Sequence, residues 1–470
     1  MALWALWVLE GARTGVTKSD VWVDGTPVTT WTDGSDGPAV VIAHGFAGSR
    51  QMMQAYALTL ARAGYTVHSF DFEGHGRHRD PMSGDVTSLD GTTRLLMKQT
   101  GQVIAYARQG KEPVALLGHS MATDILVRTA AEVEDVGPIV LLSAFSLAIT
   151  PEFPKDLLLI VGAWEPGLTD FALKAAGMVQ PDAGFGDLAQ DEGIRRRAML
   201  APYAEHVAIL HSRDGQRAAL DWLNESHART STTAVPPTGW ALLALLAAIT
   251  ALAAPLARIW PTNPEPPEAI QARDFTLIAL LPAVVAPLVA VPIKTGFLPV
   301  LVADYLAMHL LVFGIIQLAL LRRKNRLTGK VRPVAAILLV VWALGAFGYA
   351  LDRYGANFWP TGDRVWIIAA LSVGTLPFML ADSLVCAAAP VWQRIAARLA
   401  FLASLAIAVV LDFERLFFLA MIAPVILLFW LTIGTMGRAF SKQAGPLSAG
   451  LALGLVLAWA LGVSFPLFKA

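Results

Sequence analysis

The chain has few charged residues and almost no cysteine. Of its 470 residues, 15% are charged and 55% are hydrophobic, and the mean hydropathy is +0.55. This balance excludes an ordinary soluble globular protein, in which about a quarter of the residues are charged. The length also exceeds that of one compact domain. We therefore expect at least two parts, one of which is unusually apolar.

The single cysteine, Cys386, excludes an intrachain disulfide. The net charge is zero, but residues 1–235 hold 19 Lys and Arg against 27 Asp and Glu, and residues 236–470 hold 17 against 9. An acidic first part argues against nucleic acid as a partner. The basic excess of the second part lies in loops between apolar runs, as in membrane proteins. Membrane lipids are therefore the partners that we expect.

Residues 2–9 are apolar, but no basic residue precedes them, no clear cleavage site follows, and a membrane span needs about 20 residues. We interpret residues 1–14 as a truncated N-terminal anchor; the alternative is an apolar tail at the membrane interface. Pro236 and Pro237 then mark a boundary between residues 15–235 and 236–470.

The most informative stretch of the chain surrounds Ser120. An apolar run at 114–117 leads into Gly118-His119-Ser120-Met121-Ala122, and residues 123–128 follow with helical spacing. The pattern predicts a strand, a sharp turn and a helix, with Ser120 on the turn. The N–H groups that open such a helix can face an oxyanion. Ala122 stands where a second glycine is usual.

Further strands are predicted along residues 15–235. A hairpin around Asp24-Gly25 comes first, and short apolar runs alternate with helical segments at 39–43, 65–70, 139–143, 157–161 and 197–201. This alternation predicts an α/β domain, with a mostly parallel sheet flanked by helices and a site formed by the loops at the carboxyl ends of the strands.

Over residues of about 15–228 these motifs resemble the α/β-hydrolase family. The resemblance rests on His44-Gly45-Phe46, on the loop 71–76, on the turn at Ser120, on Gly162-Ala163-Trp164-Glu165 and on Glu205-His206. The order along the chain is nucleophile, acid, histidine, as in that family. The resemblance implies a serine hydrolase with an α/β-hydrolase fold.

A serine hydroxyl needs a base within hydrogen-bonding reach and an acid that orients the base. His206 follows the last predicted strand, and we expect it to be the base; His211 is expected to be structural, and His227 lies in a polar tail. The acid is Glu165, with Asp170 as the alternative.

By the same resemblance, the backbone amides of Phe46 and Met121 form the oxyanion hole. The histidines in and after the loop 71–76 lack a third ligand at useful spacing, so we expect no metal, and the chemistry needs no cofactor. Only about fourteen residues separate Ser143 from Leu157, which predicts an open pocket without a large lid. Residues 177–194 form either a small flap or a surface loop.

The second part contains apolar runs of near-spanning length. They lie at 239–257, 274–293, 298–321, 333–351, 365–388, 399–411, 416–436 and 447–468, and predict a transmembrane bundle of about eight helices. Twelve basic residues fall on one side of these runs and five on the other. The richer side should be cytoplasmic. This orientation predicts a bacterial inner-membrane protein whose hydrolase-like domain is extracytoplasmic.

Three polar residues stand out inside the apolar runs: Asp304, His309 and Asp382. An aspartate at mid-bilayer costs about 2.5–3.5 kcal/mol and usually has a partner or a wet cavity. They form either a proton or ion relay, or caps and links between helices.

The leading hypothesis from the sequence is a membrane-tethered serine hydrolase that cleaves a carboxylic ester, of a small molecule or a lipid, through an acyl-enzyme. The alternatives are a transporter or membrane scaffold with a hydrolase-like binding domain, and an acyltransferase or peptidase that uses the same three residues.

Overall fold

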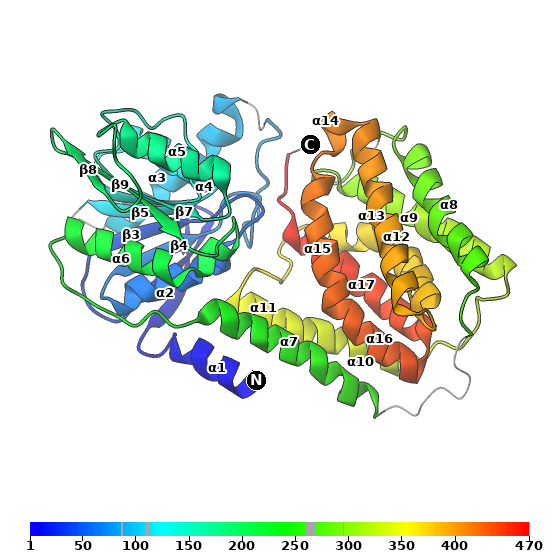
Figure 1. The fold of residues 1–470 in the computed structure, drawn as a ribbon. Helices are drawn as coiled ribbons and strands as arrows, with labels where there is room; N and C mark the ends of the chain where they lie inside the picture. Colours follow the sequence, from blue (N-terminus) through cyan, green and yellow to red (C-terminus); the bar gives the residue numbers. More distant parts are fainter. Residues whose placement is uncertain (86–87, 109–112, 260–267, 295, 470) are drawn as a thin grey trace. The chain divides into compact units, whose positions relative to one another are not determined.

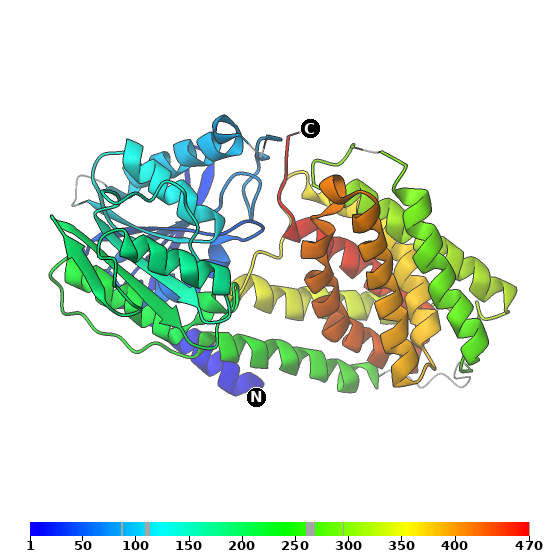
Figure 2. The ribbon, with the colours of Figure 1, turned by 45° about the horizontal axis from the view of Figure 1, so that its top comes forward.

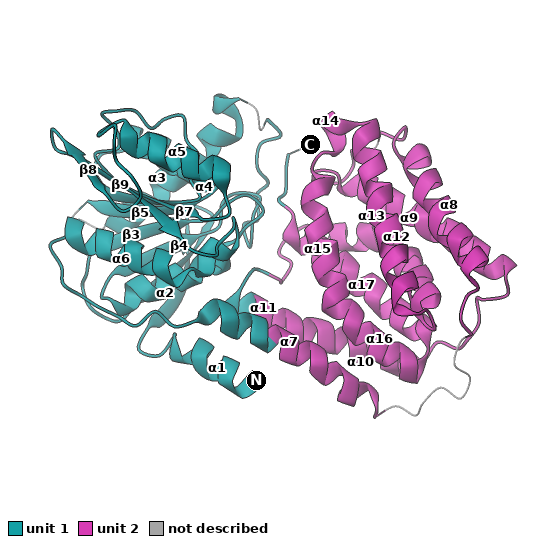
Figure 3. Ribbon diagram, in the orientation of Figure 1, with its two compact units in different colours: residues 1–245, 352–357, 466–469 teal, residues 246–351, 358–465, 470 magenta. Residues whose placement is uncertain are grey.

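The computed structural model describes residues 1–469 except 86–87, 109–112, 260–267 and 295. The chain forms two compact units (Figure 3). Unit 1 contains residues 1–245, 352–357 and 466–469, and unit 2 contains residues 246–351 and 358–465. Unit 1 therefore includes two short segments from late in the chain.

A nine-stranded sheet forms the middle of unit 1, in the order β1-β2-β4-β3-β5-β6-β7-β9-β8 (Figure 1). The neighbours from β4 to β9 are parallel, and β1, β2 and β8 pair antiparallel at the edges. The strands are β1 Thr17–Val23, β2 Thr26–Thr32, β3 Ala39–Ala43, β4 Thr66–Phe70, β5 Val114–His119, β6 Val136–Leu142, β7 Asp156–Gly162, β8 Leu188–Asp191 and β9 Ile194–Ala201. The predicted α/β architecture is confirmed.

The central strands are apolar along their whole length because helices cover both faces of the sheet. Every residue of β3 and β5 is buried. Figure 1 shows α2 (Gln54–Arg62) and α6 (Arg213–Ser226) on one face, and α3 (Arg94–Arg108), α4 (Met121–Glu132) and α5 (Pro166–Gly177) on the other. The other helices of this unit are α1 Ala2–Gly11, η1 Arg50–Met53, η2 Leu89–Thr93 and η3 Ala208–His211.

Two tight hairpins close the edges of the sheet. Asp24 and Gly25 both have positive φ, 46° and 85°, as a two-residue turn between right-twisted strands requires. Glu192 and Gly193, with φ of 41° and 83°, do the same between β8 and β9. We expected either a small flap or a surface loop at 177–194, and neither describes its second half, because Leu188–Asp191 extend the sheet as β8. The Glu192-Gly193 pair was the missed turn signal.

Eight helices in the described part of the chain are long and apolar enough to cross a membrane, as the hydropathy predicted. They begin with α7 Thr238–Ala257, and α8 to α17 gather into a bundle (Figure 2). The bounds are α8 Ala272–Ala290, α9 Ala303–Arg323, α10 Pro333–Val341 continuing through η4 Trp342–Gly348 into α11 Tyr349–Tyr354, α12 Arg364–Cys386, α13 Val391–Leu411, α14 Phe413–Leu416, α15 Leu419–Leu431, α16 Ile433–Ala444 and α17 Pro446–Ser464.

Glycines bring the helices of the bundle into close contact. A Cβ on Gly450 or Gly454 of α17 would lie 2.7 Å from the Cα of Leu380 or 2.8 Å from the Cα of Leu376, both on α12. On the other side of α12, a Cβ on Gly374 would overlap the carbonyl oxygen of Ala307. Such small residues are how membrane helices pack without a hydrophobic driving force.

The sixth span is longer than its hydropathy predicts. The apolar run begins at residue 399, but α13 begins at Val391. Arg394 and Arg398 lie in the first two turns and lower the hydropathy there. The helix continues through them because tertiary packing, rather than local composition, decides most helix ends.

His309 and Asp304 have partners inside unit 2. His309 contacts the hydroxyl of Tyr305 at 2.8 Å through Nδ1 and that of Ser404 at 3.0 Å through Nε2, and so links α9 to α13. Asp304 accepts a hydrogen bond from the N–H of Leu298 at 3.1 Å, just before α9. These contacts fit the interpretation as caps and links between helices.

Candidate active site

Ser120 occupies a sharp turn between a strand and a helix. β5 ends at His119, α4 begins at Met121, and Ser120 between them has φ 53° and ψ −119°, outside the regions that side chains favour. The turn needs small neighbours: a Cβ on Gly118 would lie 2.5 Å from Leu126 Cδ1 and 3.3 Å from the Cβ of Ala122. Strain of this kind persists only where the surrounding structure holds it.

Three predicted residues from three separate loops meet at this turn. His206 Nε2 lies 2.8 Å from Ser120 Oγ, and His206 Nδ1 lies 2.6 Å from Glu165 Oε1. Glu165 is 8% exposed, whereas Asp170, the alternative acid, is exposed on α5. The geometry therefore favours Glu165 over Asp170 as the group that orients the imidazole.

The second oxygen of Glu165 is also held. Oε2 accepts hydrogen bonds from Ser143 Oγ at 2.7 Å and from the N–H of Gly162 at 2.9 Å. Burial alone would raise the pKa of Glu165, but the hydrogen bonds from His206, Ser143 and Gly162 lower it below its usual value. The carboxylate is thus ionised and fixed, so Nδ1 of His206 carries a proton and Nε2 can accept one.

Ser143 is a site residue that the sequence reading missed. It directly follows β6, is 1% exposed, has a positive φ of 50°, and donates its N–H to Ile160 at 2.8 Å. Its signal in the sequence was weak, because it is only one small polar residue at the end of the buried strand β6. The neighbouring strand β7 leads to Glu165.

His119 holds the backbone around Ser120. Its Nε2 donates to the carbonyl oxygen of His206 at 2.7 Å. Burial, with a smaller contribution from the neighbouring His206, lowers the pKa of His119 to about 4. The ring is therefore neutral at pH 7 and serves as a fixed donor.

His44 has a similar supporting role. Its Nε2 accepts the N–H of Phe72 at 3.1 Å, which makes Nδ1 the protonated nitrogen that donates to the carbonyl of Gly45 at 2.7 Å. Burial lowers the pKa of His44 as well. The ring joins the loop 44–48 to the loop that begins at Asp71.

Two backbone segments flank Ser120 where an oxyanion would form. The N–H of Met121 is the first of α4, so it has no acceptor within the helix and lies at the positive end of its dipole. On the other side, a Cβ on Gly45 would lie 3.0 Å from the Cβ of Ser120 and 2.9 Å from His119 Nδ1. A side chain there would have to displace its neighbours, and Phe46 follows Gly45 directly.

Comparison with known families agrees with this geometry. Residues 35–232 match the family model described as serine aminopeptidase, S33. This part of the chain is an α/β-hydrolase domain. The match ends before the apolar helices, and a search of the curated proteins found no match.

Three solved structures illustrate the range of proteins to which the hydrolase domain is similar. A predicted CIB-like hydrolase from Thermoplasma acidophilum is 16% identical, with 45% of this chain and 98% of that chain covered and a TM-score of 0.35. A dienelactone hydrolase from Anabaena variabilis is 17% identical, with 46% and 100% covered and a TM-score of 0.35. A bacterial membrane phospholipase A is 15% identical, with 48% and 92% covered and a TM-score of 0.35.

A buried ion pair between Arg50 and Asp71 connects the end of the loop 44–48 to the loop that begins at Asp71. Asp71 accepts hydrogen bonds from the N–H and from Nη1 of Arg50, both at 2.7 Å, and from the N–H of Arg77 at 3.0 Å. Asp71 is fully buried and Arg50 is 6% exposed. Removing one partner would leave an unpaired buried charge, so the pair fixes the two loops to each other.

The late segments of unit 1 pack against the same loops. Leu467 donates its N–H to Gly74 and accepts that of Met82, both at 2.8 Å, and the rings of Phe468 and Phe46 are 6.4 Å apart. The N–H of Asn357 donates to Ser49 Oγ at 3.0 Å. Residues from the end of the chain thus help to position the loop that carries Phe46.

A pocket of about 360 Å³ opens at Ser120 and His206. Its walls include Met121, Asp124, Ile125, Arg128, Ser143, Phe145, Leu147 and Leu168. The segment between β6 and β7 contains no helix, and Phe145 and Leu147 within it are 55% and 77% exposed. This open, mostly apolar entrance agrees with the short connection in the sequence.

Proposed function

We propose that the hydrolase domain cleaves carboxylic esters through an acyl-enzyme. The observation that carries the proposal is the unbroken chain of hydrogen bonds from Ser120 through His206 to Glu165. A bare serine hydroxyl is a weak nucleophile, and this arrangement is what activates one.

In the first half of the reaction, Ser120 Oγ attacks the ester carbonyl carbon while its proton passes to His206 Nε2. Glu165 stabilises the imidazolium, and the amides of Met121 and Phe46 stabilise the oxyanion, at about 3 kcal/mol per donor. The intermediate collapses as His206 gives the proton to the leaving alcohol. A water molecule then repeats the sequence on the acyl-enzyme, which releases the acid and restores Ser120.

The pocket favours an uncharged, apolar acyl group. Ile125, Phe145, Leu147 and Leu168 supply apolar walls. The one carboxylate in the lining, Asp124, is already bound by Arg128 at 2.7 Å and by Ser146 at 2.7 Å, so its charge is balanced. An aminoacyl substrate, which the description of the family suggests, is the second candidate because Asp124 could hold an amino group if Arg128 released it.

We further propose that the eight apolar helices tether this domain to the bacterial inner membrane, with the domain on the extracytoplasmic side. The support is the length and hydropathy of the helices and the unequal distribution of basic residues. An impermeant maleimide tests this on intact cells. It should label Asp182→Cys in the hydrolase domain and not Lys330→Cys between α9 and α10, with Cys386→Ser as background; the reverse pattern contradicts the proposed orientation.

Turnover by the purified full chain tests the chemistry. We expect hydrolysis of p-nitrophenyl esters, fastest for a short or medium acyl chain, and no turnover by Ser120→Ala. Alanine p-nitroanilide in the same assay represents the aminoacyl candidate. Esterase activity that survives in Ser120→Ala overturns the proposal, and preference for the anilide favours the second candidate.

A further inference from the structure

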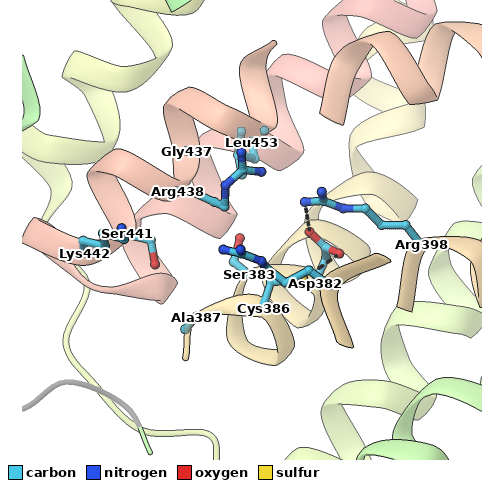
Figure 4. Close-up of a pocket in the computed structure, with 12 residues that line it drawn as sticks. Asp382, Ser383, Cys386, Ala387, Arg398, Gly437, Arg438, Ser441, Lys442 and Leu453 are labelled. Atoms are coloured by element: carbon cyan, nitrogen blue, oxygen red, sulfur yellow. Dashed lines mark hydrogen bonds and ion pairs between the residues drawn. The ribbon is translucent and has the colours of Figure 1, made fainter. Parts of the chain in front are cut away.

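A second pocket lies within unit 2, among α12, α13, α16 and α17 (Figure 4). Two helices each contribute two cations one turn apart: Arg394 and Arg398 from α13, and Arg438 and Lys442 from α16. The cavity is about 30 Å³, against about 360 Å³ at Ser120, so it admits a small group and not a bulky one. The hydrolase chemistry does not use this pocket.

Positive charge in this pocket exceeds negative charge. Its lining holds four cations and one carboxylate, Asp382, which is 8% exposed. Asp382 forms a salt bridge with one of these cations, with Arg398 Nη2 at 3.8 Å from Asp382 Oδ2. Cys386 donates to the other oxygen of Asp382 at 3.6 Å. Once Asp382 has balanced one cation, three positive charges remain.

Arg398 also has an unused donor. Its Nε is buried and has no hydrogen-bond partner among the described residues, while its guanidinium lies 5.2 Å from the ring of Trp430. A buried donor without an acceptor destabilises the fold, because it has given up its hydrogen bond to water. Figure 4 shows the guanidinium groups of Arg398 and Arg438 pointing toward each other, so an acceptor between them would satisfy both.

Two helix ends lie at this pocket, and one adds to its positive field while the other opposes it. Arg394 lies in the first turn of α13, where the macrodipole is positive and a cation is unfavourable. Lys442, in contrast, lies in the last turn of α16, where a cation is favourable. The position of Arg394 is therefore not explained by helix stability, and a bound anion would offset its cost.

We propose that this pocket binds a phosphate group, either in the headgroup of an anionic phospholipid or as the free ion. Guanidinium groups bind phosphate oxygens in pairs, and Arg is better suited to this than Lys. The hydroxyls of Ser383 and Ser441, which also line the pocket, add donors. The site is thus a binding site distinct from the ester-cleaving one.

The test uses the delipidated full chain. Native mass spectrometry measures retention of phosphatidylglycerol against phosphatidylcholine, and calorimetry measures binding of inorganic phosphate. The pocket variant is Arg394→Gln/Arg438→Gln. Its control, Arg322→Gln/Arg323→Gln, removes the same charge from exposed positions at the end of α9. Thermal melting shows whether each variant folds.

We expect phosphatidylglycerol or phosphate to bind wild type and the control alike, and the pocket variant at least tenfold more weakly. Binding of the lipid alone assigns a headgroup, and binding of phosphate alone assigns the free ion. Equal weakening in both variants, or no binding of either probe to wild type, overturns the proposal. If the pocket variant fails to fold, a competition experiment on wild type replaces it. Phosphate at millimolar concentration should displace bound phosphatidylglycerol, and chloride at equal ionic strength should not.

Discussion

The two units use the same kinds of residue for different purposes. In unit 1, Gly45 lies where a loop approaches Ser120, and Gly118 lies where β5 approaches α4. In unit 2, glycines lie where helices touch, as at Gly450 and Gly454. Buried charge differs in the same way, because Asp71 of unit 1 has a full set of partners, whereas the pocket at Arg398 has more cations than carboxylates. Glycine thus makes room around Ser120 in unit 1 and between helices in unit 2.

Replacement of His206 should have the largest effect on activity, and it should leave unit 2 unchanged. We expect His206→Gln to lower kcat/KM for an ester by about 10⁴-fold or more, because triad members act as a unit. His227→Gln is the control, since its Nδ1 contacts the carbonyl of Leu223 in α6. Ester hydrolysis by both variants at equal concentration checks this; comparable losses would contradict the assignment.

Replacing each candidate acid by its amide should show which of the two orients His206. Glu165→Gln removes the charge that fixes the tautomer of His206, and we expect a loss of about 10³- to 10⁴-fold in kcat. Asp170→Asn should leave kcat unchanged, because Asp170 is exposed on α5. Steady-state kinetics of the two variants decide, and a larger loss in Asp170→Asn would reverse the assignment.

A methyl group at Gly45 should impair unit 1 without unfolding it. The new Cβ would lie 3.0 Å from Ser120 Cβ and displace the loop by a few tenths of an ångström. We expect Gly45→Ala to lower kcat about 10- to 100-fold, since small misplacements are costly in an active site. Gly167→Ala, where a Cβ meets no atom within 4 Å, should retain full activity.

A methyl group at a helix contact in unit 2 should lower stability without lowering activity. Gly454→Ala overpacks the contact between α17 and α12, which costs about 1–3 kcal/mol. Gly345→Ala, with its nearest atom 3.9 Å away, should be neutral. Thermal melting in detergent measures the shift, and kcat should stay constant in both. Parallel loss of kcat in Gly454→Ala would show that the units are not separable.

The smallest effect concerns pH. The pKa of His119 falls from 6.5 to about 4 on folding, so the unfolded chain binds more protons between these values. Acidification from pH 6.5 to 4 therefore destabilises the fold. In His119→Gln, which keeps a donor but does not titrate, the decline in melting temperature over this range should be shallower; an identical slope would mean that the ring is already protonated in the fold.

Much of the site could be predicted because its chemistry follows the strands. Ser120, Glu165 and His206 each lie within a few residues of a strand end, and parallel strands bring their carboxyl ends together. The resemblance of Gly162-Ala163-Trp164-Glu165 to the family's motif was the reason to prefer Glu165. Only the fold separates it from Asp170, through the turn in which the N–H of Glu165 donates to the carbonyl of Gly162.

Other features depend on contacts between distant residues and leave no local pattern. Ser143 meets Glu165 because β6 and β7 are neighbours, and Leu467 reaches Gly74 across nearly the whole chain. The start of α13 could not be predicted for a different reason. Arg394 and Arg398, which line the proposed phosphate pocket, also interrupt the apolar run.

Labelling with a fluorophosphonate probe tests the central claim most directly. The account predicts that the full-length protein gains one phosphonyl adduct, that the modified peptide contains Ser120, and that Ser120→Ala gains none. An adduct on another residue, or equal labelling of wild type and Ser120→Ala, would contradict it.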